Sequence, residues 1–233
     1  MHALYHSYVR MHRMKHHYKA VLFDLDGTLI DTEHSAAIAV QNCFRSWQIQ
    51  IQLEDISYAT GRTWESAFTY LFEKYKIPVS QDEAKHQIMA QYRKDLNENL
   101  QTVPGGAAAV QSLSKEFKLA LVSGSSRQDI LWALDKLKIR EHFQVILGAE
   151  DYPRSKPSPD GYQKAIQSFQ VQPHECIVFE DSSAGISSAR QAGTWVVAIT
   201  STNHFQQDIT QAHLQIPDLR PVNPSWIRHL SLE

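Results

Sequence analysis

The sequence predicts an α/β fold, a doubly wound parallel sheet with a small α-helical domain inserted after its first strand. Short runs of branched apolar residues recur along the chain without alternating polar positions, which is typical of parallel strands buried on both faces. Helical patterns lie between most of these runs, and strands that alternate with helices form a parallel sheet. One stretch, from Thr32 to about Leu100, contains helical patterns and no convincing strand.

Five apolar runs are the predicted strands. They cover residues 20–25, 119–123, 145–149, 176–180 and 195–199. Two of the helices between them have N-terminal signals. Ser126 is expected to cap a helix that runs to Leu137, with an acidic residue three positions on. Ser158 followed by Pro159 predicts a cap and a first-turn proline.

The inserted stretch is predicted to be helical throughout. Apolar residues recur at helical spacing before Trp47 and after Trp64, so both tryptophans are expected in the core of the insert rather than against a substrate. Ser80 is expected to cap a third helix of the insert. Asp31 is expected to cap the first one, at the point where the chain leaves the sheet.

These patterns divide the chain into a core and an insert. Residues 18–31 and 101–233 are assigned to the core, and residues 32–100 to a helical cap domain over the carboxyl edge of the sheet, where open α/β sheets bind ligands. Residues 1–17 are basic and rich in His and Tyr, and they lack the apolar segment of a secretion signal. We expect them to form a poorly ordered leader.

The bulk composition argues against several classes of protein. The 233 residues carry a formal net charge of −2, so no global field attracts nucleic acid or a membrane surface. No apolar run approaches the roughly 20 residues that span a bilayer. The two cysteines, Cys43 and Cys176, lie far apart and favour a reducing compartment over a disulfide framework. We therefore expect a cytoplasmic monomer that binds neither nucleic acid nor membrane.

Two carboxylates stand at the end of the first predicted strand. Asp24 and Asp26 lie two positions apart, and residues at that spacing point to the same side of a strand. Gly27 then permits a tight turn that presents both of them at the carboxyl edge of the sheet. Two carboxylates so close repel each other unless a cation compensates them. The chain must therefore supply a cation or hold one.

Other strand ends supply complementary groups. Glu180 and Asp181 end the strand at 176–180, Ser123 ends another strand just before a helix, and Lys156 follows a third strand in a Ser/Pro loop. Oxygen ligands of this kind suit a hard cation such as Mg²⁺, and a helix N-terminus suits a phosphate group. The GxGxxG and GxxxxGK[ST] phosphate loops are absent from the sequence, which argues against dinucleotide binding and P-loop chemistry.

The ordered set DLDGT at residues 24–28, Ser123, Lys156 and Glu180–Asp181 resembles the four motifs of the haloacid dehalogenase superfamily. The helical insert after the first motif resembles the small cap of the phosphatase and phosphoglucomutase-like subfamily. The resemblance covers about Tyr18 to about Thr200, and it implies a Rossmann-like core with an inserted cap.

The resemblance also implies a role for each catalytic position. Asp24 would attack phosphorus and carry a transient aspartyl-phosphate. Asp26 would protonate the leaving alcohol and later activate the hydrolytic water. Ser123 would bind the transferring phosphoryl oxygens, and Lys156 would neutralise both Asp24 and the phosphoryl group.

The same resemblance implies a metal site and substrate contacts. Asp181 would hold Mg²⁺ together with Asp24, Glu180 and the backbone carbonyl of Asp26. The residues expected to bind phosphate or substrate are Thr28 and Gly124 in the core and Arg62 in the cap.

The expected function is Mg²⁺-dependent hydrolysis of a small phosphorylated metabolite. A sugar phosphate is the first candidate substrate, followed by phosphoglycolate or a nucleoside monophosphate. The alternative is a phosphosugar mutase. The β-phosphoglucomutase pattern has a His ten residues after the second Asp and an Arg three residues after the cap-loop Gly, whereas Ala36 and Trp64 occupy those positions here. This favours hydrolysis. A catalytically silent binding protein is a further alternative, but it predicts damaged motifs, and every expected catalytic position is filled.

Overall fold

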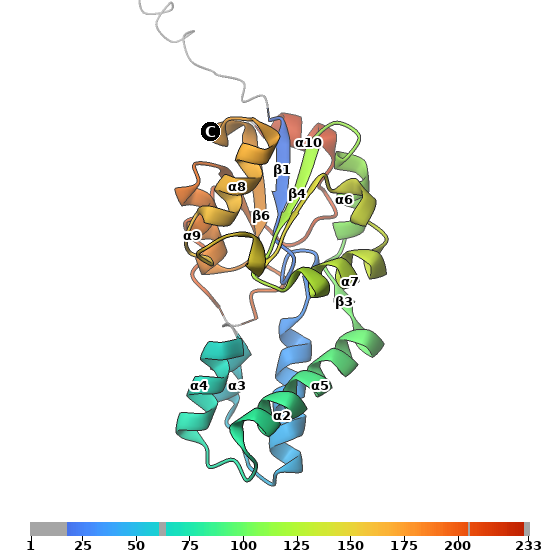
Figure 1. The fold of residues 1–233 in the computed structure, drawn as a ribbon. Helices are drawn as coiled ribbons and strands as arrows, with labels where there is room; N and C mark the ends of the chain where they lie inside the picture. Colours follow the sequence, from blue (N-terminus) through green and yellow to red (C-terminus); the bar gives the residue numbers. More distant parts are fainter. Residues whose placement is uncertain (1–17, 61–63, 205, 231–233) are drawn as a thin grey trace, which may run out of the picture.

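A computed structural model describes residues 18–60, 64–204 and 206–230 of the chain (Figure 1). Within these residues six parallel strands form one sheet in the order β5-β4-β1-β6-β7-β8. Their bounds are Ala20–Phe23 for β1, Lys118–Val122 for β4, Val145–Leu147 for β5, Cys176–Glu180 for β6, Trp195–Ile199 for β7 and Leu214–Ile216 for β8. The predicted doubly wound parallel sheet is therefore confirmed.

Each of the five predicted strands is present, although three have shifted ends. β1 ends at Phe23 rather than at residue 25, because the Leu25 carbonyl accepts hydrogen bonds from the N–H groups of Thr28, Leu29 and Ile30 and the chain turns there. β4 and β5 end at residues 122 and 147, before the loops that begin at Ser123 and Gly148. The sixth strand, β8, was not predicted.

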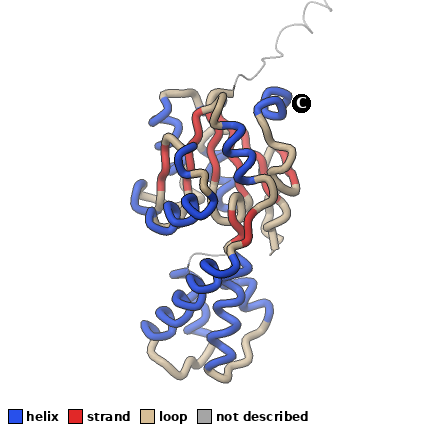
Figure 2. Tube along the Cα trace, turned by 90° about the vertical axis from the view of Figure 1, so that its right-hand side faces the viewer, coloured by secondary structure: helices blue, strands red, loops and turns tan. Residues whose placement is uncertain are grey.

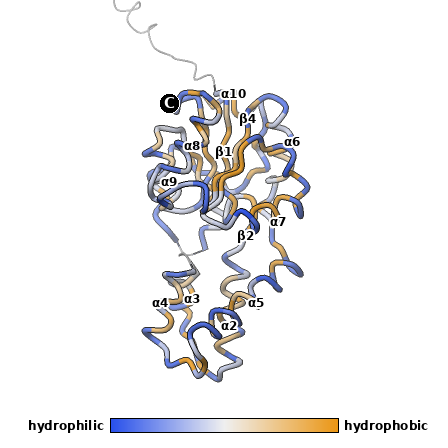
Figure 3. Tube along the Cα trace, in the orientation of Figure 1, coloured by the Kyte–Doolittle hydropathy of each residue, from blue (hydrophilic) through white to orange (hydrophobic). Residues whose placement is uncertain are grey.

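Helices cover both faces of the sheet. Strand β1 is fully buried, and its side chains alternate between two apolar cores. Val21 and Phe23 belong to the first core, and Ala20 and Leu22 to the second. The first core includes helices α6 (Gly106–Leu113), α7 (Arg127–Leu137) and α10 (Pro224–His229). The second includes α8 (Asp160–Phe169) and α9 (Ser183–Gln191). The strands are accordingly the most hydrophobic part of the molecule (Figure 3).

The insert between β2 and β3 is helical and stands apart from the sheet (Figures 1 and 2). Its helices are α2 (Glu33–Ser46), α3 (Leu53–Thr60), α4 (Trp64–Lys74) and α5 (Gln81–Asn99), and they share an apolar core of their own. Strands β2 (Ile30–Asp31) and β3 (Gln101–Thr102) pair antiparallel, so the chain enters and leaves the insert side by side. Short 3-10 turns complete the described elements at Arg140–His142, Ala149–Asp151 and Pro173–Glu175.

Of the four helix caps predicted from the sequence, two are confirmed and two are wrong. Ser80 and Ser126 do cap their helices, since their hydroxyls accept hydrogen bonds from the N–H groups three residues on. Asp31 does not cap α2. The cap position is Thr32, and the Asp31 carboxylate instead pairs with His204 at 2.7 Å. Ser158 does not cap α8 either.

The reason for the second error is a shift of one residue. Pro159 itself takes the cap position of α8, and the Ser158 hydroxyl donates a hydrogen bond to the Asp160 carboxylate at 2.7 Å.

The leader predicted for residues 1–17 lies outside the described residues. In the part of the chain that the structure describes, no helix combines the length and apolarity that crossing a membrane would require.

Candidate active site

The carboxyl ends of three adjacent strands place the predicted site residues together. β4 and β6 lie on either side of β1, and all three run parallel. Asp24 follows β1, Ser123 follows β4, and Glu180 and Asp181 lie at the end of β6. Lys156 joins them from the loop before α8. The structure thus brings together groups that are separated by up to 157 positions in the sequence.

Lys156 bridges Asp24, which follows β1, and Glu180, at the end of β6. Its ammonium donates to Asp24 Oδ1 and, at 2.5 Å, to Glu180 Oε1. The lysine side chain is 14% exposed, and burial would lower its pKa, but the charges of Asp24 and Glu180 outweigh burial and hold that pKa well above its usual value. Lys156 is therefore a fixed positive charge beside the Asp24 carboxylate.

Glu180 is the best satisfied of the buried carboxylates. Its Oε1 also accepts from the Tyr162 hydroxyl at 2.9 Å, and its Oε2 accepts from the N–H groups of Asp181 and Ser182. Burial alone would raise the pKa of Glu180, but Lys156 and these hydrogen bonds lower it below the usual value. Glu180 is consequently ionised.

Asp24 and Asp181 have fewer compensating contacts. Burial raises the pKa of Asp24 well above its usual value, with Lys156 opposing the shift and Glu180 adding to it. Burial, followed by the charges of Glu180 and Asp24, likewise raises the pKa of Asp181. The Asp181 side chain receives a long hydrogen bond of 3.4 Å from Thr28. This part of the site carries an excess of negative charge that a cation would relieve.

The donor set fits a divalent metal ion. Ligand oxygens of Asp24, Glu180 and Asp181 lie within 4.8 Å of one another, and all three residues are buried. Two glycines make room for these carboxylates. A Cβ on Gly27, whose φ is +84°, would lie 2.0 Å from Asp181 Oδ2, and a Cβ on Gly185 would lie 1.8 Å from Glu180 Oε1. Three buried carboxylates beside one lysine suit a hard cation such as Mg²⁺.

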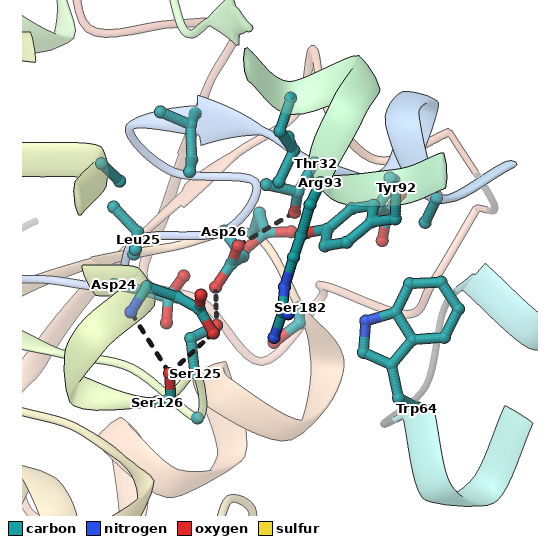
Figure 4. Close-up of a pocket in the computed structure, with 18 of the residues that line it drawn as sticks. Asp24, Leu25, Asp26, Thr32, Trp64, Tyr92, Arg93, Ser125, Ser126 and Ser182 are labelled. Carbon is teal, nitrogen blue, oxygen red and sulfur yellow. Dashed lines mark hydrogen bonds between the residues drawn. The ribbon is translucent and has the colours of Figure 1, made fainter. Parts of the chain in front are cut away.

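Both carboxylate oxygens of Asp26 accept hydrogen bonds from hydroxyl groups (Figure 4). Its Oδ2 accepts from Ser125 Oγ at 2.7 Å and from Ser123 Oγ at 3.2 Å, and its Oδ1 accepts from Thr32 Oγ1 at 3.0 Å. Sequence reasoning missed Ser125 and Thr32. The serine-rich turn VSGSS was a usable signal for Ser125, whereas Thr32 gave none.

A cavity of about 730 Å³ opens beside Asp24 and Asp26, between the core and the insert. The insert contributes a wall to it, lined by Glu33, Ala36, Ala59, Trp64, Met89, Tyr92, Arg93, Leu96 and Asn97. Trp64 packs partly against the core of the insert, as predicted, and it also lines this cavity. Glu33 was not predicted as a site residue, and burial raises its pKa to about 7.

The remaining predicted substrate contacts occupy different places. Gly124 lines the cavity, and the space where its Cβ would lie is open. Thr28 is fully buried and contacts Asp181. Ser123 is also fully buried, with its hydroxyl directed at Asp26. Arg62 lies outside the described residues.

Comparisons with known proteins point to one family. The family model of the haloacid dehalogenase-like hydrolases matches residues 21–199. The validoxylamine A 7'-phosphate phosphatase of Streptomyces hygroscopicus subsp. limoneus is 32% identical over 206 residues, which are 88% of this chain and 96% of that protein. The phosphorylated carbohydrates phosphatase of Thermotoga maritima is 28% identical over 176 residues, 75% of this chain and 82% of that protein.

A solved structure shows the same fold. The β-phosphoglucomutase of Clostridium difficile matches with a TM-score of 0.72 at 24% identity, over 91% of this chain and 96% of that one. The family match and the phosphatase relatives show a hydrolase that acts on phosphate monoesters, built on a parallel sheet with a helical insert. The chain belongs to the haloacid dehalogenase-like hydrolases.

Proposed function

We propose that the protein hydrolyses a small sugar phosphate through an aspartyl-phosphate on Asp24, with Mg²⁺ as its cofactor. The observation that carries the proposal is the position of Asp24. It directly follows the central strand β1, lines the cavity, and accepts a hydrogen bond from the Lys156 ammonium on its Oδ1. A carboxylate in that position can serve as a nucleophile, and the lysine can neutralise charge that develops during transfer.

In the first step an oxygen of Asp24 forms a bond to phosphorus. The bond between phosphorus and the ester oxygen breaks, its electron pair stays on that oxygen, and the oxygen takes a proton from Asp26. In the second step Asp26 takes a proton from water, and the water oxygen bonds to phosphorus. The bond from phosphorus to Asp24 breaks, and its electron pair returns to the carboxylate.

Asp24, Glu180 and Asp181 would hold Mg²⁺, together with the Asp26 carbonyl implied by the family motif. The bound ion would offset the repulsion between the phosphate and these carboxylates. Lys156 contacts both Asp24 and Glu180, so it holds two of the three carboxylates in place.

The lining of the cavity supports a sugar phosphate as the substrate class. Glu33 and Asn97 offer polar groups, and Glu33 Oε2 is buried without a hydrogen-bond partner among the described residues. A sugar hydroxyl could donate to that oxygen. Trp64 and Trp132 add flat apolar walls against which the face of a sugar ring can pack. The phosphatase of Thermotoga maritima also supports this class, because its name specifies phosphorylated carbohydrates.

The residues at positions 36 and 64 favour hydrolysis over the mutase reaction. Ala36 and Trp64 both line the cavity where the mutase pattern has a His and an Arg. Neither side chain can take part in acid–base chemistry or form an ion pair with a second phosphate. The cavity therefore lacks, at these positions, the groups that would hold a bisphosphate while it reorients.

Release of inorganic phosphate from a panel of sugar phosphates, phosphoglycolate and nucleoside monophosphates tests the proposal. We expect release that requires Mg²⁺, disappears with EDTA, and is fastest for a sugar phosphate. The same samples should be checked for isomer conversion by NMR. Isomerisation without phosphate release would support the mutase instead, and silence in both assays would support a binding protein.

A further inference from the structure

Arg93 is a positive charge on the wall that the insert contributes to the cavity. It lies on α5. The residues of this helix that line the cavity are Met89, Tyr92, Arg93, Leu96 and Asn97. They recur every three to four positions, so they share one face of the helix. Figure 4 shows the Arg93 side chain extending from α5 into the cavity.

Arg93 has no acidic partner among the described residues. No ion pair joins its guanidinium to a carboxylate in that part of the chain. Its neighbours three and four positions away on α5 are uncharged, and they are Met89, Ala90, Leu96 and Asn97. Lys94, the next residue, has Glu98 four positions on and does not line the cavity. The helix therefore offers Lys94 a partner and leaves Arg93 without one.

Within the described residues, Lys156 is the only other cation on the cavity wall. It already contacts the carboxylates of Asp24 and Glu180. Arg93 has made no such contact, and a guanidinium presents its N–H donors in a planar fork that matches the two oxygens of a carboxylate or a phosphate. Its position and its unused donors suit an anionic group that arrives with the substrate.

The phosphate that is cleaved has its place at the other side of the cavity. Under the proposed mechanism, phosphorus must come within bonding reach of Asp24, which follows β1 in the core. Lys156 and the three clustered carboxylates lie at that end. Arg93 enters from the insert, so the group that it meets belongs to the part of the substrate that leaves.

We propose that Arg93 is a specificity-determining residue that binds a second anionic group, a carboxylate or a second phosphate, on the leaving part of the substrate. The inference rests on the proposed function, and it narrows the substrate class from sugar phosphates in general to those that carry another negative charge. Arg93 forms an ion pair with that group, and no bond or proton changes at the arginine.

Matched substrates test this assignment, because the members of a pair differ at the group that Arg93 would bind. Sorbitol 6-phosphate and 6-phosphogluconate differ by a hydroxymethyl group against a carboxylate, and so do glycerol 3-phosphate and 3-phosphoglycerate. Fructose 6-phosphate and fructose 1,6-bisphosphate differ by a hydroxyl group against a second phosphate. Phosphate release with Mg²⁺ present gives kcat and KM for each compound.

We expect the wild type to prefer the charged member of at least one pair in kcat/KM, and that pair identifies the anion as a carboxylate or a phosphate. Arg93→Gln should lower the preference by about 10- to 100-fold, because hydrogen bonds between charged groups are lost. The change should appear mainly in KM, since the contact lies away from the reacting atoms. Arg93→Lys keeps the charge without the fork and should restore part of the preference.

Lys94→Gln is the matched control. It removes the same charge from the adjacent position of α5, so it alters the general field of the helix without touching the cavity. K94Q should keep the preference of the wild type. An equal loss in K94Q and R93Q would assign the effect to that field and overturn the contact.

The remaining outcomes separate this inference from the function on which it rests. Equal losses by R93Q on both members of every pair would overturn the inference, because they would place Arg93 at the cleaved phosphate. A wild type that cleaves uncharged sugar phosphates and has no preference for their charged counterparts would also overturn it. Both results would leave the proposed hydrolysis intact, whereas a wild type that releases no phosphate from any compound would overturn both. Arg93 is exposed, so R93Q and R93K should fold, and circular dichroism checks this.

Discussion

At the scale of single residues, the charge of Asp181 is strongly affected by its surroundings. It is 4% exposed, it lies beside two other carboxylates, and Lys156 contacts those two rather than Asp181. Its pKa is accordingly raised by burial and by its neighbours. Under the proposed function, this carboxyl group would be destabilising in the metal-free protein and would become a ligand when a cation is bound.

Asp181→Asn should therefore have opposite effects in the two states. Without metal, the variant should be more stable than the wild type by about 1 kcal/mol, a rise in Tm of roughly 2–4 °C, because a buried repulsive charge is removed. With Mg²⁺, the wild type should gain stability and the variant should gain little, because ligand loss weakens the site by tenfold or more. Thermal unfolding in EDTA and in Mg²⁺ measures both effects.

Asp135→Asn is the control for this comparison. It makes the same chemical change at an exposed carboxylate that pairs with Arg140, so it should leave both melting curves unchanged. Equal Mg²⁺ stabilisation of D181N and the wild type would rule Asp181 out as a ligand.

At the scale of elements, a buried polar cluster joins α3 to α4 in the insert. Asp55 on α3 is 1% exposed and accepts hydrogen bonds from Tyr70 and Lys74 on α4 and from Tyr75 just after it. Hydrogen bonds from Lys74, Tyr70 and Tyr75, in that order of importance, lower the pKa of Asp55 from 3.8 to about 2. The contacts favour the ionised form, so they stabilise the insert most when Asp55 is charged.

Asp55→Asn should destabilise the protein by roughly 2–3 kcal/mol at neutral pH, since hydrogen bonds to a charged group are lost and the buried donors are left poorly satisfied. The pKa is lower in the folded than in the unfolded protein, so the contribution is complete above about pH 4 and is lost as the pH falls toward 2. Urea unfolding at pH 7 and near pH 3 measures it. A penalty that did not shrink at the lower pH would contradict the assigned ionisation.

The elements also show which parts of the secondary structure could be predicted from the sequence. The apolar runs of β6 and β7 gave their exact extents, because a parallel strand buried on both faces leaves an unbroken apolar signature. β8 is an edge strand of three residues, and its sequence LQI, with an exposed central Gln215, carries too little pattern to be recognised. The Asp31 cap failed because its carboxylate pairs with His204, a partner that no local pattern indicates.

In the candidate site, some residues could likewise be predicted from the sequence and others could not. Asp24, Lys156, Glu180 and Asp181 could be named from the sequence, because strand ends in a parallel sheet must meet at one edge. Tyr92 could not be named. It lines the cavity from α5, and its place there depends on how α5 packs against α2, two helices whose sequences specify apolar faces but no relative placement.

For the whole molecule, the position of the insert limits what can reach Asp24. The cavity of about 730 Å³ is bounded by the core and by the insert, and β2 and β3 connect the two as paired strands. A cavity of this volume matches a small ligand. We infer that a folded phosphoprotein would have to displace the insert before its phosphate could reach Asp24.

Size selection is thus expected of the intact protein. Phosphate release from the best sugar phosphate should exceed release from a phosphorylated protein such as casein by at least about 100-fold in kcat/KM, because misplacement of the reacting group alone has an effect of that order. A phosphoserine-containing tripeptide serves as the intermediate case. Comparable rates for casein and the sugar phosphate would show that the insert does not restrict access.

The most direct test of the account is phosphate release by Asp24→Asn, measured beside the wild type and the surface control D135N, with Mg²⁺ present and with folding checked by circular dichroism. We predict that the wild type and D135N release phosphate at the same rate. D24N should lose turnover by a factor of at least about 10³ while remaining folded, because an amide cannot act as the nucleophile. Turnover by folded D24N within tenfold of the wild type would contradict the assignment of Asp24 and the two-step hydrolysis built on it.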